Sequence, residues 1–483
     1  MGSSEQTAAM NRIQSLFDEN SFVEIGAKVT KRNTDFNLDE KEVPADGVIT
    51  GYGLIDGNMV YVYSQDASAL GGAIGEMHAK KIVKIYDLAM KTGVPVIGLV
   101  DCAGLRLQEA TDALDAFGTL YTKKVMASGV IPQITAVFGS CGGGVAVANA
   151  LGDFTFMEKE KAKVFVNSPN VLDENYTDKL DTASAAFQAE SGNVDFVGSE
   201  EEIFAQLRQL VTILPTNNEE DDSFGECEDD LNRASSAFEG DLSDPRAALT
   251  DLSDNGLFVE VKKAYAKEMV TGFVRLNGMT VGVVANASSY LDEDGKEIAH
   301  FDKVLTTAGC EKAEHFINVC DAFQIPVLSF TDVKGYKSTV DEEKTIGKAA
   351  AKLTYAFANA TVPKVNVITG EAFGSAYITM NSAHIGADLV FALPEAKIGM
   401  MDAEQAVKIM YADEIKSAPD AQAKISEKAA VYEAMQSSAD AAAAHGYVDN
   451  IIQGSSVRKQ MIFAFEMLFT KRDGRPDKKH GTI

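Results

Sequence analysis

Apolar residues recur three and four positions apart at two places in the chain, which is the spacing of the buried face of an α-helix. One stripe is made by Ile82, Ile85, Tyr86 and Ala89, and the other by Phe316, Val319, Cys320 and Phe323. We expect each stripe to form a helix whose apolar face is buried.

Short apolar runs lie around each stripe and predict strands. In the first half these are residues 96–100, 134–138 and 154–157, after a hairpin (52–55 and 59–63) that turns at Asp56, Gly57 and Asn58. Helices are expected at 113–126 and 145–151. In the second half the predicted strands are 327–330, 365–369 and 389–393. Such alternation of strands and helices is typical of α/β domains with mostly parallel sheets.

The pattern of the first half returns in the second half after a shift of 231 residues. Pro95 and Pro132 lie 37 residues apart, and so do Pro326 and Pro363. A loop of small residues follows the second proline of each pair by 11 residues, at Gly143 and Gly374. The sequence therefore predicts a duplicated domain.

An acidic segment separates the two copies. Eight of the 14 residues of 217–230 are Asp or Glu, and none is basic. We expect domains at 1–216 and 241–483, with an exposed and dispensable linker at 217–240.

The charge of the chain limits its partners. Among 483 residues, 44 Lys and Arg face 71 Asp and Glu, a net charge of −27. This charge argues against nucleic-acid binding. No apolar run approaches the roughly 20 residues that span a bilayer. The five cysteines form no CxxC pair, which favours reduced thiols, a cytoplasmic location and the absence of a metal site.

Two loops carry candidate chemistry. Residues 141–144 (CGGG) follow a predicted strand and open a helix, and 373–376 (FGSA) do so in the second copy. Backbone N–H groups at such loops can hold an anionic oxygen. The alternative is a close helix–strand crossing that needs small residues. A second candidate site is the segment 101–109 (DCAGLRLQE), at the carboxyl end of a strand, where α/β sheets bind ligands; its alternative is a capped turn.

The chain resembles the carboxyltransferase component of biotin-dependent acyl-CoA carboxylases and sodium-pumping decarboxylases. Ordered blocks over nearly the whole length carry the resemblance: residues 61–76, 128–156, 269–286, 322–335, 351–376 and 446–481. It implies two tandem crotonase-like ββα-superhelix domains. It also implies an oligomer, a dimer or a trimer of dimers, in which the first half of one subunit faces the second half of another across the active site.

The resemblance also implies a reaction and its residues. A carboxyl group would move between carboxybiotin and the α-carbon of a short acyl-CoA, such as propionyl-, methylmalonyl-, acetyl- or malonyl-CoA. Gly143 and Gly144 match the residues that hold the thioester oxygen, and Ser375 and Ala376 those that hold the biotin carbonyl. Six further residues are expected to bind substrate: Gly104, Arg106, Gly142, Gly335, Tyr336 and Gly374.

The expected cofactor is biotin on a separate carrier protein, and no metal is needed. A biotin carboxylase or a membrane decarboxylase subunit would be a further partner. Two alternatives stay open. One is a biotin-independent crotonase-type hydratase or isomerase, with Glu109 as the candidate acid–base group. The other is a non-catalytic CoA-binding subunit, suggested by departures from the family pattern at Ala186, Tyr336 and Ser375.

Overall fold

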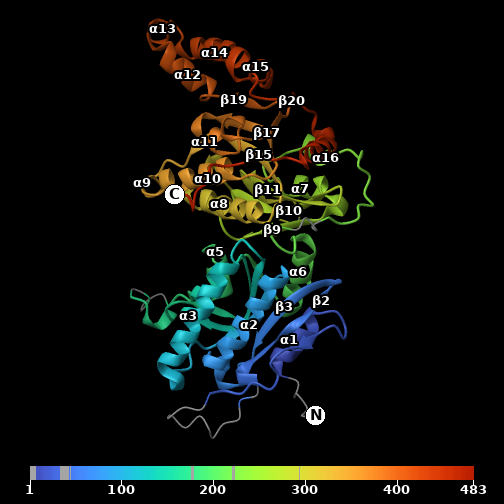
Figure 1. Ribbon diagram of the computed structural model, residues 1–483. Coiled ribbons are helices and arrows are strands. Elements are labelled where there is room, and N and C mark those ends of the chain that lie inside the picture. The colour runs from blue at the N-terminus through green and yellow to red at the C-terminus, as the bar shows by residue number, and fades with distance from the viewer. Residues whose placement is uncertain are drawn as a thin grey trace. The chain divides into compact units, whose positions relative to one another are not determined.

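The computed structural model describes residues 7–32, 43, 45–173, 175, 179–219, 224–292 and 294–483. The chain divides into two compact units, Met1–Ser223 and Phe224–Ile483 (Figure 1). Each unit is built on one large, mostly parallel sheet with helices packed against it. The predicted α/β architecture is therefore confirmed.

In the first unit the strand order is β1-β2-β3-β4-β5-β6-β8, with β7 paired to β5. The first three strands are antiparallel and the remaining pairs are parallel. The strands are β1 (Val23–Glu24), β2 (Val48–Ile55), β3 (Asn58–Gln65), β4 (Val96–Cys102), β5 (Gln133–Gly142), β6 (Phe154–Glu158), β7 (Lys163–Phe165) and β8 (Phe196–Gly198). The helices are α1 (Ala8–Leu16), α2 (Glu76–Thr92), α3 (Ala110–Ala127), α4 (Gly144–Ala150), α5 (Ala185–Glu190) and α6 (Glu200–Ile213).

The second unit repeats this plan in the order β9-β10-β11-β15-β17-β18-β20, with β19 paired to β17. Its main strands are β9 (Phe258–Val261), β10 (Met269–Leu276), β11 (Met279–Asn286), β15 (Val327–Val333), β17 (Lys364–Phe373), β18 (Leu389–Ala392), β19 (Lys397–Gly399) and β20 (Asn450–Ile451). Two small pairs are added, β12 (Ser289–Leu291) with β13 (Glu297–His300), and β14 (Val304–Leu305) with β16 (Gly335–Tyr336). The helices outside the extension described below are α7 (Arg246–Leu252), α8 (Thr307–Ala322), α9 (Val340–Glu343), α10 (Ile346–Asn359), α11 (Gly374–Thr379) and α16 (Val457–Leu468).

The predicted helical stripes lie on α2 and at the end of α8, and all eight of their side chains are buried. The duplication extends to a polar detail of these two helices. Lys81 of α2 and Lys312 of α8 are 231 positions apart, and both are buried. Each donates to backbone carbonyls of the turn that precedes the sheet, Lys81 to Ala45 at 2.9 Å and Lys312 to Tyr265 at 2.8 Å. Burial lowers the pKa of Lys81 to about 8 and that of Lys312 to about 7.

A carboxylate fixes the two central strands of each sheet just before the predicted glycine loop. The Asp101 Oδ1 accepts the N–H of Ser140 at 3.2 Å, and Asp332 Oδ1 accepts that of Glu371 at 2.8 Å. The strand register shifts at this point in both sheets. Only a glycine fits beside the carboxylate, because an added Cβ on Gly139 would lie 2.0 Å from Asp101 Oδ1.

A helical extension, residues 403–444, is a feature that we did not expect. It contains α12 (Ala403–Met410), α13 (Ala412–Ser417), α14 (Ala421–Tyr432), a π-helical turn (Glu433–Ser437) and α15 (Ala439–Ala444). A small apolar cluster of its own holds it together: Ala403, Val407, Ile425 and Ala429. Figure 1 shows these helices grouped beyond β19 and β20 of the second unit.

The acidic segment is not a free linker at its ends, which corrects the expectation of an exposed 217–230. Asn217 is buried and donates to the Gly93 carbonyl at 3.0 Å. On the other side, Phe224 packs on Phe469, and Asp229 pairs with Arg233 at 2.9 Å. The acidic residues between them, 220–223, lie outside the described residues.

In the described part of the chain, no helix is both long and apolar enough to cross a membrane.

The carboxylate that orders the loop predicts a large effect of a single methyl group. Gly139→Ala and Gly370→Ala should each lower the free energy of unfolding by about 1–3 kcal/mol, because the displaced carboxylate leaves a backbone N–H without its acceptor. The control is Gly118→Ala on the exposed face of α3, where a Cβ meets nothing within 4 Å. This variant should gain about 0.5–1 kcal/mol from helix propensity. Urea denaturation measures all three, and equal stabilities would contradict the account.

Candidate functional site

The two loops that the sequence pairs have the same backbone conformation. Gly143 has φ 61° and Gly374 has φ 62°, a region that favours glycine. Each lies between a central strand (β5 or β17) and a short helix (α4 or α11). The predicted correspondence between the two copies therefore holds at the level of single dihedral angles.

In the first loop, packing explains two of the three glycines. An added Cβ on Gly142 would lie 2.8 Å from the Phe165 ring, and one on Gly144 would lie 2.6 Å from Phe117. The Gly143 N–H already donates to the Phe165 carbonyl at 2.9 Å. Of the two donors expected here, Gly143 is therefore occupied, and Gly144, at the start of α4, remains the candidate. Gly104 lies next to this loop, with its added Cβ 4.0 Å from the Gly142 carbonyl oxygen.

The second loop opens into a pocket of about 440 Å³. Gly374, Ser375 and Tyr377 of α11 line one side, and residues of the helical extension, among them Tyr432 and Gln436, line another. The N–H groups of Ser375 and Ala376 belong to the first turn of α11, which has no intrahelical acceptors for them. The π-helical turn that carries Gln436 is an irregularity often found at functional sites.

Aromatic rings line this pocket, and the sequence analysis missed all of them. Tyr377, His384, His445 and Tyr447 form a chain in which neighbouring ring centroids are 5.2–6.1 Å apart. The expected substrate residues Gly335 and Tyr336 do not line the pocket. Instead β16 pairs with β14, and the Tyr336 hydroxyl lies 3.3 Å from Thr379 Oγ1, so this residue supports α11 from the side.

Arg106 is not placed to bind substrate, which corrects the expectation from the sequence. Its side chain is 1% exposed. Its guanidinium is paired with Asp46 at 2.5 Å and with Glu109 at 2.8 Å, and it donates to the Ala73 carbonyl at 2.9 Å. The arginine therefore binds three parts of the chain together inside the first unit.

Glu109 belongs to the same buried cluster. One carboxylate oxygen pairs with Arg106, and the other accepts the Glu76 N–H at 2.6 Å at the start of α2. His78 completes the cluster, because Asp46 accepts its backbone N–H at 2.7 Å and its ring lies 3.1 Å from the Gln65 amide. The Glu109 carboxylate is thus occupied, and nothing here favours the hydratase reading that needs it as an acid–base group.

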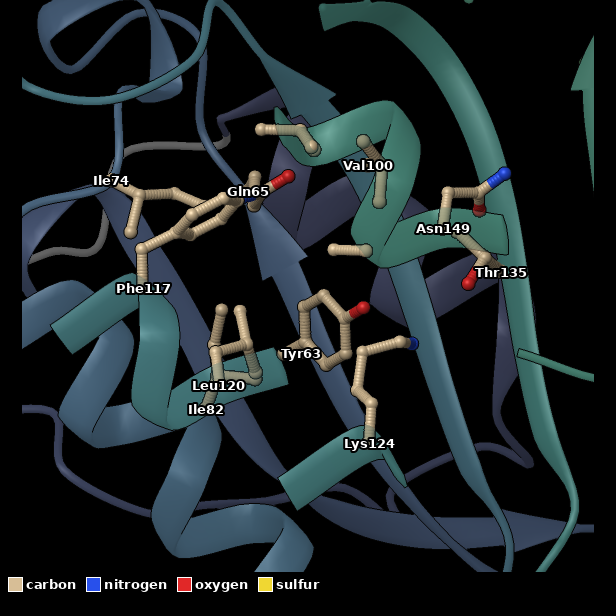
Figure 2. Close-up of a pocket in the computed structure, with 12 residues that line it drawn as sticks. Tyr63, Gln65, Ile74, Ile82, Val100, Phe117, Leu120, Lys124, Thr135 and Asn149 are labelled. Carbon is tan, nitrogen blue, oxygen red and sulfur yellow. The ribbon is translucent and has the colours of Figure 1, made fainter. Parts of the chain in front are cut away.

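A second polar cluster lies among the core side chains next to α4 (Figure 2). The Lys124 ammonium donates to the Tyr86 hydroxyl at 3.0 Å, and Asn149 of α4 donates to Thr155 at 3.2 Å. Figure 2 shows Tyr63 and Lys124 converging on a small cavity, of about 20 Å³, that Thr135 and Asn149 also line. This cavity can hold at most one water-sized ligand, so we interpret the cluster as support for α4.

Comparison with known proteins agrees with this geometry. Residues 3–483 match the carboxyl transferase domain, and the chain belongs to this family of enzymes. It is 39% identical to the methylmalonyl-CoA decarboxylase subunit alpha of Propionigenium modestum, covering 99% of this chain and 93% of that protein. It is also 39% identical to the propionyl-CoA carboxylase carboxyltransferase subunit of Haloferax mediterranei, with 98% and 93% covered.

Among solved structures, the transcarboxylase 12S hexamer with methylmalonyl-CoA bound is similar over 98% of this chain and 91% of that chain, with a TM-score of 0.91 and 36% identity. The match spans both units. The family expected from the sequence is confirmed.

The buried position of Arg106 predicts a structural defect when it is replaced. Arg106→Met leaves two buried carboxylates without their partner and should lower the free energy of unfolding by about 3–5 kcal/mol. The Michaelis constant for acyl-CoA should stay unchanged in the protein that remains folded. The matched control is Lys337→Met, 231 positions on, whose ion pair with Asp302 is exposed; its stability should change little. A stable Arg106→Met protein with a raised Michaelis constant would restore a substrate role.

The buried imidazole of His78 predicts a pH dependence of stability. Burial lowers the pKa of His78 from 6.5 to about 3, so the folded state keeps it neutral while the unfolded state takes up a proton. The free energy of unfolding should therefore fall as the pH is lowered from about 6.5 towards 3. His78→Gln should flatten this dependence between pH 7 and 5, and His315→Gln on the exposed face of α8 should not. Denaturation midpoints at several pH values decide between these outcomes.

Proposed function

We propose that this enzyme moves a carboxyl group between carboxybiotin, borne by a separate carrier protein, and the α-carbon of a short acyl-CoA. The observation that carries the proposal is the pair of equivalent loops at Gly143 and Gly374, in a chain that matches the carboxyl transferase domain throughout. Two related loops suit a reaction in which two carbonyl oxygens must be held at once.

The N–H of Gly144 is proposed to hold the thioester oxygen of the acyl-CoA, with Gly142 and Gly104 shaping the loop beside it. As the α-proton leaves, negative charge develops on this oxygen, and a fixed N–H donor stabilises it. Carboxybiotin supplies the carboxyl group and a ureido nitrogen that accepts the α-proton. No acid–base side chain is then required, in agreement with the occupied state of Glu109.

The N–H groups of Ser375 and Ala376 are proposed to hold the ureido carbonyl of biotin, with Gly374 providing the turn. The pocket beside them fits such a group, because its volume of about 440 Å³ and its aromatic walls suit a neutral bicyclic ring. No proposal is made for Arg106, Gly335 or Tyr336 in direct contact with substrate.

The remaining partners follow from the same proposal. We propose that the chain works in the cytoplasm with a biotin carrier protein, and with either a biotin carboxylase or a membrane decarboxylase subunit. A homo-oligomer, a dimer or a trimer of dimers, would bring the first loop of one subunit to the second loop of another. Light scattering checks this, and a stable, active monomer near 51.7 kDa would contradict it.

The proposed reaction is tested by mixing the protein with methylmalonyl-CoA or malonyl-CoA and a biotinylated carrier domain. Loss of the acid-CoA that depends on biotin is the expected result. Water addition to an enoyl-CoA without biotin would point to a hydratase, and CoA binding without turnover to a non-catalytic subunit. Either result would overturn the proposal.

Catalysis by backbone donors predicts a contrast between two neighbouring substitutions. Ala376→Pro deletes an N–H and should lower turnover by about 10²–10³. Ser375→Ala keeps every N–H and removes an exposed hydroxyl, so its effect should be mild. Turnover is measured with biotinylated carrier at saturating acyl-CoA.

Each variant must first show the melting temperature and oligomer size of the original protein, because Ala376 is buried. Ser375→Pro, at an exposed position, replaces Ala376→Pro if the latter does not fold. A loss in Ser375→Ala as large as that in a folded proline variant would identify the hydroxyl, and not the backbone, as the working group.

A further inference from the structure

We infer that the Tyr377 hydroxyl is a third hydrogen-bond donor to the reactant in the pocket beside Gly374, and that it holds an oxygen of the carrier-borne group. The inference rests on the proposed function, since it assigns the occupant of that pocket. It concerns a side chain that the backbone-donor mechanism does not use.

The first observation is an unpartnered polar atom. Tyr377 is 4% exposed, yet among the described residues its hydroxyl has no hydrogen-bond partner. Buried hydroxyl groups are normally paired, because leaving one unpaired costs its interaction with water. Two other tyrosines near the loops follow this rule: the Tyr121 hydroxyl donates to Gly144 and that of Tyr336 contacts Thr379.

The second observation is the location of Tyr377. It lies on α11, two residues after Ser375, and it lines the pocket of about 440 Å³ together with Gly374 and Ser375. The T-shaped contact of its ring with His384 orients it from the side. A ligand that enters this pocket therefore meets the unpartnered hydroxyl and the first turn of α11 in the same place.

The third observation comes from the duplication. The shift of 231 residues that pairs Gly143 with Gly374 pairs Ala146 with Tyr377. Ala146 is buried on α4 and carries no polar group. The two loops thus share a backbone but differ in this side chain, as expected if they hold different reactants.

The chemistry of the hydroxyl sets the ligand that it can hold. Burial raises the pKa of Tyr377 to about 12, so the group stays protonated at neutral pH and acts as a donor. The pocket contains aromatic and apolar side chains, with Met400 and Ile398 among them. Such a site suits a neutral ring with a carbonyl oxygen, the chemistry of a ureido group.

The test is Tyr377→Phe, which removes the hydroxyl and keeps the ring. With biotinylated carrier as the varied substrate, the Michaelis constant should rise about 3- to 10-fold, the effect of one hydrogen bond between uncharged groups. The Michaelis constant for acyl-CoA should stay within about twofold, and the melting temperature should be equal or higher, since an unpartnered buried hydroxyl is removed. The dissociation constant of free biotin, measured by calorimetry, should rise by the same factor.

The control is Tyr355→Phe on α10, whose hydroxyl accepts from Lys478 and lies outside the pocket. It should leave both Michaelis constants unchanged. If Tyr377→Phe equals the original protein with biotinylated carrier, or if only the acyl-CoA constant rises, the inference is wrong while the proposed function stands. If the original protein shows no biotin-dependent turnover at all, the proposed function fails, and with it the identity of the ligand.

Discussion

Both candidate loops depend on one interaction, the hydrogen bond between an aspartate at the end of one central strand and a backbone N–H of the next. Asp101 and Asp332 accept these bonds next to Gly139 and Gly370, where the register of the parallel pair shifts. The shift occurs three to four residues before each loop, so it sets the direction in which β5 and β17 deliver their glycines. Because a parallel sheet brings the carboxyl ends of its strands to one edge, this is also where an α/β fold places ligands.

The two halves use the same backbone for different purposes. At positions that are 231 residues apart, Arg106 is buried with two carboxylates, whereas Lys337 has an exposed ion pair. Ala146 and Tyr377 differ in the same way, and the helical extension at 403–444 is inserted into the second unit. Duplication therefore preserved the strands and turns that position the loops, while the side chains around them diverged.

Much of the fold could be predicted, because apolar periodicity reports burial directly. The hairpin, the stripes of α2 and α8 and the central strands all follow from that pattern. Arg106 was misinterpreted because a charged residue beside a strand end looks like a ligand contact, and its partner Asp46 is 60 positions away in sequence. The acidic segment was taken for a free linker because composition does not reveal that Asn217, Phe224 and Asp229 pack at its ends.

The pocket could not be predicted from motifs, since its walls come from the helical extension, whose alanine-rich sequence carries little periodic signal. Tyr377 could have been found by comparing the two copies residue by residue, because it replaces the alanine of the first copy.

The central claim is that each loop holds one of two different carbonyl oxygens. An experimental structure of the enzyme with a non-reactive acyl-CoA thioether ketone and free biotin tests it most directly. The account predicts the ketone oxygen within hydrogen-bond distance of the Gly144 N–H. It places the biotin carbonyl at the Ser375 and Ala376 N–H groups. A structure with the ketone oxygen at the second loop, or with neither ligand near a loop, would contradict it.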